Sequence, residues 1–241
     1  MKRIHPLLLS LIPLVYFAAP GFCEDAGKAV WNIQVEVQIV ELPEDLARPL
    51  IPELLNEKTI EAANEKVQAL IAGKKATLIG WPILTTKSGQ RAVIEAIDEI
   101  RYVTEYETAN EGGGAATIAE KMADKAEHKT DRSEFFPIPK AFEVRNAGVT
   151  LEVEPVLSPD ASKIDLNLVP QYVKLAGYKR ITVEKDHVKL VVEQPEFHTT
   201  KVTTSLTLRN GQRKLLGVHK VTDPAGHVEL FILKASATEL K

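Results

Sequence analysis

The chain has 241 residues, a formal net charge of −3 and a single cysteine, Cys23. A mildly acidic chain without a tract of Lys and Arg is poorly suited to neutralising phosphates, so we do not expect nucleic acid as a partner. One cysteine excludes both an internal disulfide and a thiolate metal cluster. The stability of the fold must therefore come from packing.

The first 23 residues have the pattern of a signal peptide. Two basic residues precede an apolar run at residues 7–19, and Gly21-Phe22-Cys23 follows as a cleavage site. The run is shorter than the roughly 20 residues of a membrane-spanning helix. We therefore expect export and cleavage before Glu24. The alternative is a lipid-modified Cys23, which the bulky Phe22 in front of it disfavours.

Residues 24–109 are expected to form the first part of a folded core. In QVEVQIVEL (34–42), apolar side chains alternate with polar ones, which predicts a strand that is buried on one face. The next segment carries three prolines, which predict an irregular structure. These are Pro43, Pro49 and Pro52.

A helix is predicted at residues 60–72, because apolar side chains recur there at helical spacing. Thr59 is the expected N-cap, and Gly73 is expected to take a left-handed conformation after the helix. Residues 75–85 and 91–99 then alternate like two strands of one hairpin around Ser88-Gly89. The second strand is expected to continue to Tyr106.

Residues 110–134 are rich in Gly and then in charge, which predicts a polar loop. The strand pattern returns in residues 135–236, the second part of the core. The Asn210-Gly211 pair predicts a type I′ hairpin in which both residues have positive φ. Residues 237–241 are expected to form a C-terminal tail. The expected fold class is mainly β with one or two helices (α+β), with antiparallel sheets and a helix between the first and second strands.

Four segments, in this order, resemble the core domain of the bacterial secretins, the ring-forming outer-membrane channels of type II and type III secretion and of type IV pili. They are VQALIAGKKATLIGWPILTTKSGQRAVIEAIDEIRYV (67–103), NAGVTLEVEPVLSPDASKIDLNLVPQYV (146–173), QPEFHTTKVTTSLTLRNGQRKLLGVHK (194–220) and HVELFILKAS (227–236). The opening strand at 34–42 is similar as well. The resemblance implies a non-enzymatic envelope protein of the periplasm or outer membrane, partnered by like subunits in a ring or by another envelope secretion protein.

Two segments depart from the family. The family's gate-forming hairpins would fall near residues 105–140, which are polar here, and the membrane-facing lip would fall in the short stretch 218–227. Strands also carry charge on their second faces, as at Glu36 and Glu152, which disfavours a membrane-embedded sheet. The alternative function is therefore a soluble periplasmic interaction module that forms no pore. An exported enzyme is the third hypothesis.

No catalytic, cofactor-binding or metal-binding residue is predicted. His219 and His227 are expected to face each other across a hairpin, yet no third ligand is spaced with them. The Gly triplet at 112–114 lacks the Lys-Ser/Thr of a phosphate-binding loop. Two charged groups are expected to be solvated, one on a strand edge and one in a loop. They are Glu95, Asp98 and Glu99, and Lys174, Lys179 and Arg180 near Tyr172 and Tyr178.

Overall fold

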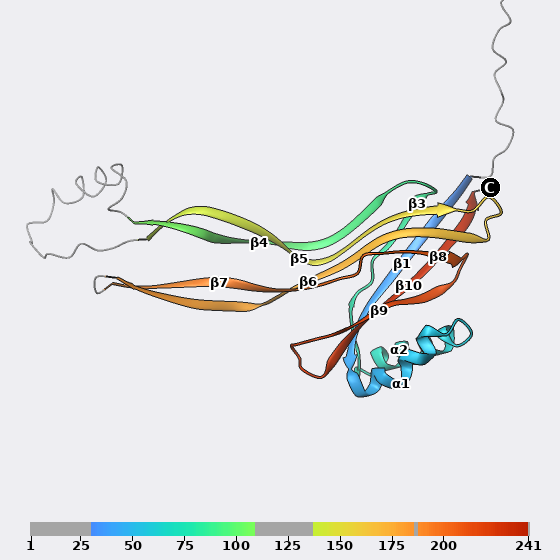
Figure 1. Ribbon diagram of the computed structural model, residues 1–241, viewed down its shortest axis with the longest axis horizontal. Coiled ribbons are helices and arrows are strands. Elements are labelled where there is room, and N and C mark those ends of the chain that lie inside the picture. Colours follow the sequence, from blue (N-terminus) through green and yellow to red (C-terminus); the bar gives the residue numbers. More distant parts are fainter. Residues whose placement is uncertain (1–29, 109–136, 186–187, 241) are drawn as a thin grey trace, which may run out of the picture.

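The computed structural model describes residues 30–108, 137–185 and 188–240. Ten strands and two helices are formed there, and the predicted fold class is confirmed: antiparallel sheets with both helices between the first two strands (Figure 1). The elements are β1 (Val30–Pro43), α1 (Glu44–Leu55), α2 (Ile60–Ala72), β2 (Thr77–Gly80), β3 (Ile83–Lys87), β4 (Ala92–Thr108), β5 (Pro137–Leu157), β6 (Lys163–Lys185), β7 (Val188–Lys201), β8 (Thr204–Arg209), β9 (Arg213–Lys220) and β10 (His227–Leu240). The predicted loop at 110–134 and the signal peptide lie outside the described residues.

The strands form two five-stranded sheets. Sheet A has the order β2-β1-β10-β9, with β3 also paired to β1, and sheet B has the order β4-β5-β6-β7, with β8 also paired to β6. Strands β1 and β10 pair along their whole length, from Val30 opposite Leu240 to Pro43 opposite His227. The predicted tail therefore belongs to sheet A as far as Leu240.

Three layers result from this pairing. Sheet A packs one face against sheet B and the other against the two helices. The alternation in β1 explains the arrangement, because Val35 and Val37 point towards sheet B while Val40 and Leu42 point towards the helices. Sheet A is thus covered on both sides.

Helix α1 corrects the prediction that the prolines at 43–52 exclude a regular element. Pro43 is the N-cap, and Pro49 and Pro52 lie inside the helix. An interior proline costs an isolated helix about 3 kcal/mol. Here burial of Ala47, Leu50 and Leu54 between the helix and sheet A offsets that cost. Tertiary packing has overridden local propensity.

Helix α2 has the predicted bounds but different ends. The Thr59 side chain makes no capping bond, and its hydroxyl instead donates to the Glu53 carbonyl at 2.8 Å, which ties α2 to the end of α1. Gly73 has a φ of −79°, so the predicted left-handed glycine is wrong. The left-handed residue is Lys74, with a φ of 56°.

Both predicted hairpin turns are corners between the sheets. Ser88-Gly89 leads from β3 in sheet A to β4 in sheet B, and Asn210-Gly211 leads from β8 back to β9. Each turn is held by a different strand: the Gly89 N–H donates to the Pro155 carbonyl and the Gly211 N–H to the Ala235 carbonyl. Within the Asn210-Gly211 pair, Gly211 has a positive φ of 83° and Asn210 does not, so the type I′ prediction is wrong.

Sheet B is much longer than sheet A (Figure 1). Pairing of β5 with β6 ends where Gly148 lies opposite Val173. Beyond that point the β4–β5 and β6–β7 hairpins continue separately, away from the helices, and we call their residues 98–108, 137–147, 174–185 and 188–198 the arm. Gly148 marks the bend, with a φ of 132° and space for no Cβ, since that atom would lie 2.2 Å from the Ala96 carbonyl oxygen.

Candidate interaction surfaces

The two outer strands of the arm have free edges. Strand β4 pairs with β5 alone and β7 with β6 alone, so within the described residues neither outer edge has a strand partner. Unpaired backbone N–H and C=O groups on an edge form a template for another strand. Within the described residues the arm therefore has two edges without a strand partner, one on β4 and one on β7.

The two hairpins of the arm touch each other. The rings of Tyr102 on β4 and Phe197 on β7 lie 6.2 Å apart, and Gln194 Nε2 donates to the Val103 carbonyl at 2.8 Å. A second polar contact joins Arg145 to the Thr199 hydroxyl at 3.3 Å. These contacts hold the hairpins together without help from sheet A.

One face of the arm carries an exposed apolar row. Ile138, Phe142 and Val144 occupy one face of β5 and are 45%, 47% and 55% exposed. Val103 lies opposite Phe142 in the pairing, and the Arg101 guanidinium lies 4.4 Å from the centre of the Phe142 ring. An uncovered apolar row with a cation above it is typical of an interaction surface.

The charged groups predicted to be solvated lie on strands. Glu95, Asp98 and Glu99 are exposed on β4, and none has an ion pair within the described chain. The basic group lies on β6 rather than in a loop, which corrects that prediction. Its members are dispersed: Lys174 Nζ donates to the Asp223 carbonyl at 3.3 Å, and Arg180 pairs with Glu193.

The histidines do not form the predicted pair. His219 lies opposite Glu229, whereas His227 Nδ1 lies 3.0 Å from Glu41 Oε1. His198 is opposite Lys174 on the arm. No group of His, Cys, Asp and Glu able to hold a metal ion is present among the described residues. The sequence did not reveal the contact of His227 with Glu41, because β1 and β10 lie far apart in the chain.

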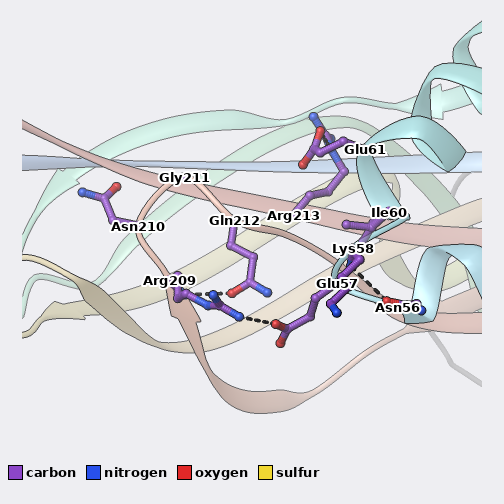
Figure 2. A pocket seen from close by; sticks show the side chains of 10 residues that line it. All are labelled: Asn56, Glu57, Lys58, Ile60, Glu61, Arg209, Asn210, Gly211, Gln212 and Arg213. Atoms are coloured by element: carbon purple, nitrogen blue, oxygen red, sulfur yellow. Dashed lines mark hydrogen bonds and ion pairs between the residues drawn. The ribbon is translucent and has the colours of Figure 1, made fainter.

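A polar hollow of about 630 Å³ lies between the α1–α2 connection and the corner from β8 to β9 (Figure 2). Arg209 pairs with Glu57, and Arg213 Nε lies 3.3 Å from Glu61 Oε2. A hydrogen bond from the Gln212 side chain and, to a smaller extent, the positive charge of Arg209 lower the pKa of Glu57. These two ion pairs fasten the helices to the corner.

A second hollow, of about 500 Å³, is apolar and lies at the edge between the two sheets. Strands β2 and β3 separate there at Trp81-Pro82, and the Trp81 side chain is half exposed. Tyr172 of sheet B lines the hollow from the other side. No helix in the described chain is long and apolar enough to cross a membrane.

The family model for the secretins, described as bacterial type II and III secretion system protein, matches residues 69–219. The chain belongs to the secretin family. The match begins in α2 and ends in β9, so it includes the arm and both corners between the sheets. No curated protein matches the sequence.

Solved structures similar to this chain include three secretins of different systems. The secretin InvG of the Salmonella SPI-1 type III injectisome is 12% identical, with a TM-score of 0.37, over 88% of this chain and 63% of that one. The type II secretin GspD of enteropathogenic Escherichia coli is 13% identical, with a TM-score of 0.38, over 90% and 71%. The type IV competence pilus secretin PilQ of V. cholerae is 12% identical, with a TM-score of 0.41, over 89% of this chain and 62% of that one. This chain thus spans about three fifths of InvG and PilQ.

Proposed function

We propose that this chain is a non-enzymatic subunit of an envelope secretion channel, assembled side by side with copies of itself. The observation that carries the proposal is the arm, whose outer strands β4 and β7 leave both edges of one sheet unpaired. A β4 edge of one copy and a β7 edge of the next can continue the sheet. Because the two edges differ, the contact is heterologous and repeats until a ring closes.

Family membership and the names of the similar structures support this function. InvG is named as a secretin of an injectisome, and GspD as a type II secretin. The apolar row of Ile138, Phe142 and Val144 supplies a surface that an assembly can cover. Another envelope secretion protein is the alternative partner for the same edges.

Export is part of the proposal. Removal of residues 1–23 would leave a chain that starts at Glu24, six residues before β1, in the periplasm or at the outer membrane. Intact-mass measurement of protein purified from the envelope tests this. A mass that includes Met1 contradicts cleavage of a signal peptide. A mass that corresponds to a lipid-modified Cys23 instead supports a chain anchored to the membrane by that lipid.

A soluble periplasmic module that forms no pore is the second candidate. The exposed carboxylates of Glu95, Asp98 and Glu99 favour it, because charge on a strand disfavours contact with lipid. Conductance recordings in planar bilayers separate the two candidates. Stable channels support the channel subunit, whereas assembled rings without conductance support the module.

The assembly itself is tested with two neighbouring proline variants, Asp98→Pro and Glu99→Pro. Successive N–H groups of a strand point to opposite sides, so one variant loses a bond to β5 and the other loses a donor on the free edge. Light scattering after size-exclusion chromatography is expected to show rings for the wild type. The edge variant should remain monomeric with an unchanged melting temperature, while the other variant should melt earlier. Assembly that survives both substitutions contradicts edge pairing through β4.

A further inference from the structure

One row of residues crosses the whole width of sheet B and ends in opposite charges. Glu95 on β4 lies opposite Thr150 on β5. Thr150 in turn lies opposite Gln171 on β6, and Gln171 lies opposite Lys201 on β7. Residues directly opposite each other point to the same face of a sheet, so the four side chains share one face. A carboxylate and an ammonium group therefore stand at the two outer edges of sheet B, level with each other along the strands.

Both end groups of this row are available to a partner. Glu95 and Lys201 are exposed, and neither has an ion pair within the described part of the chain. Strands β5 and β6 lie between them, so they do not pair with each other. Opposite charges on two strands that come together favour the arrangement in which the charges meet.

The direction of the strands allows the row to continue into another copy. Neighbouring strands of sheet B are antiparallel, so β4 and β7, the first and the fourth, run in opposite directions. A β7 edge placed beside the β4 edge of the next copy is therefore antiparallel to it, as within the sheet. When two copies stand level along their strands, Lys201 of one copy lies opposite Glu95 of the next.

The neighbouring row, on the face towards sheet A, begins at the apolar hollow of the same edge. Ile94 on β4 lines this hollow together with Trp81, which is 52% exposed. The row that starts at Ile94 passes through β5 to Pro170 on β6 and ends at Val202, whose N–H donates to the Pro170 carbonyl at 3.0 Å. A level neighbour therefore places Val202 beside the hollow, so that apolar surface meets apolar surface next to the paired charges.

We propose that Glu95 and Lys201 form an ion pair between neighbouring copies that sets the register of their contact, and that Val202 of the neighbour covers the apolar hollow beside it. This inference rests on the proposed assembly through the outer strands and extends the contact from the arm to the base of sheet B. The partner is a second copy, because the two ends of each row match in charge and polarity. A shift by two residues places Lys201 opposite Val93 or Ile97 and loses the ion pair, and a shift by one residue brings it to the wrong face.

Cysteine cross-linking tests the register in the mature full-length chain, with Cys23 absent or changed to Ser. Opposite residues of antiparallel strands have Cα atoms about 4.5–5.5 Å apart, which is within the range of a disulfide. A mixture of the Glu95→Cys and Lys201→Cys variants should therefore give covalent dimers under mild oxidation. The matched control is Glu99→Cys mixed with Lys201→Cys. It replaces another exposed carboxylate on the same face of β4, four residues further along, and should give only background dimers.

Charge reversal tests the ion pair itself. Lys201→Glu and Glu95→Lys each place like charges opposite each other, and each should raise the protein concentration at which light scattering detects assembly by about tenfold. Both changes in one chain restore opposite charges and should restore assembly. Glu154→Lys makes the same change of charge at an exposed position of β5, away from both edges, and should assemble like the wild type.

The outcomes separate this inference from the proposed assembly. Assembly of the wild type that is unaffected by charge reversal, or that the double reversal does not restore, overturns the ion pair and leaves the pairing of the edges untouched. Cross-links through Glu99→Cys instead of Glu95→Cys overturn the register in the same way. A wild type that stays monomeric at every concentration overturns both proposals.

Discussion

Sheet A and the arm are built from the same kind of strand, yet they differ in what covers them. Sheet A has sheet B on one face and two helices on the other, and Phe231 is completely buried there. The arm has neither layer, and its Phe142 is 47% exposed. Stability is therefore concentrated in the layered part, whereas the surface left for partners is concentrated in the arm.

The comparison also shows how one sheet serves both purposes. Strands β5 and β6 pack against sheet A through Leu151 and Leu166, and the same strands continue into the arm. The change occurs at Gly148, where the two hairpins part. A rigid base thus positions edges that are not themselves buried.

Truncating Phe231 in sheet A and Phe142 in the arm should give the largest difference in stability between the two regions. Phe231→Ala opens a cavity between the sheets and should cost about 3–5 kcal/mol of unfolding free energy. Phe142→Ala removes a half-exposed ring and should cost less than about 1 kcal/mol. Urea denaturation followed by circular dichroism measures both. Equal losses would show that the arm is part of the main core.

A substitution of Gly148, at the bend, should lower the unfolding free energy nearly as much. Gly148→Ala combines an unfavourable φ with a clash against the Ala96 carbonyl and should cost about 2–4 kcal/mol. The matched control is Gly211→Ala, where φ is also positive but no atom lies within 4 Å of the added Cβ. Strain alone predicts about 1–2 kcal/mol there. A control that loses as much as Gly148→Ala contradicts the steric argument.

Contact between the hairpins should give a smaller effect. A double-mutant cycle of Tyr102→Leu and Phe197→Leu is expected to yield a coupling of about 0.5–1.5 kcal/mol, as for other aromatic pairs. Hydrogen exchange of arm amides measures it, since we expect the thinly covered arm to open without unfolding sheet A. No coupling would mean that the two hairpins move independently.

The turn between β5 and β6 should show the smallest effect. Hydrogen bonds from the Ser158 hydroxyl and then from Ser162 lower the pKa of Asp160 from 3.8 to about 2. The stabilisation is complete above the unfolded value and is lost as the pH falls towards about 2. Asp160→Asn should therefore melt slightly below the wild type at neutral pH, and the difference should shrink as the pH falls through about 2 and disappear below it. A constant difference would contradict this origin.

Local patterns were reliable where a single element decides the outcome. The bounds of α2 follow from its apolar spacing, and the strand at 34–42 follows from alternation. Local patterns failed where packing against another element decides the outcome. Pro49 and Pro52 lie in a helix because sheet A buries the apolar face of that helix. Likewise, no local signal shows that Ser88-Gly89 and Asn210-Gly211 change sheets, because a turn sequence does not specify the pairing of the strands beyond it.

The sequence by itself determined the β-rich class, the helix at 60–72 and the secretin resemblance, because periodicity and ordered motifs are written in neighbouring residues. Only the tertiary structure decided which strands pair, since register depends on residues such as Glu41 and Glu229 that are 188 positions apart but lie opposite each other. The free edges of the arm and the position of the buried Glu229 opposite Glu41 both arise from that pairing. They exist because strand order, rather than composition, determines which backbone groups and which charges are left without partners.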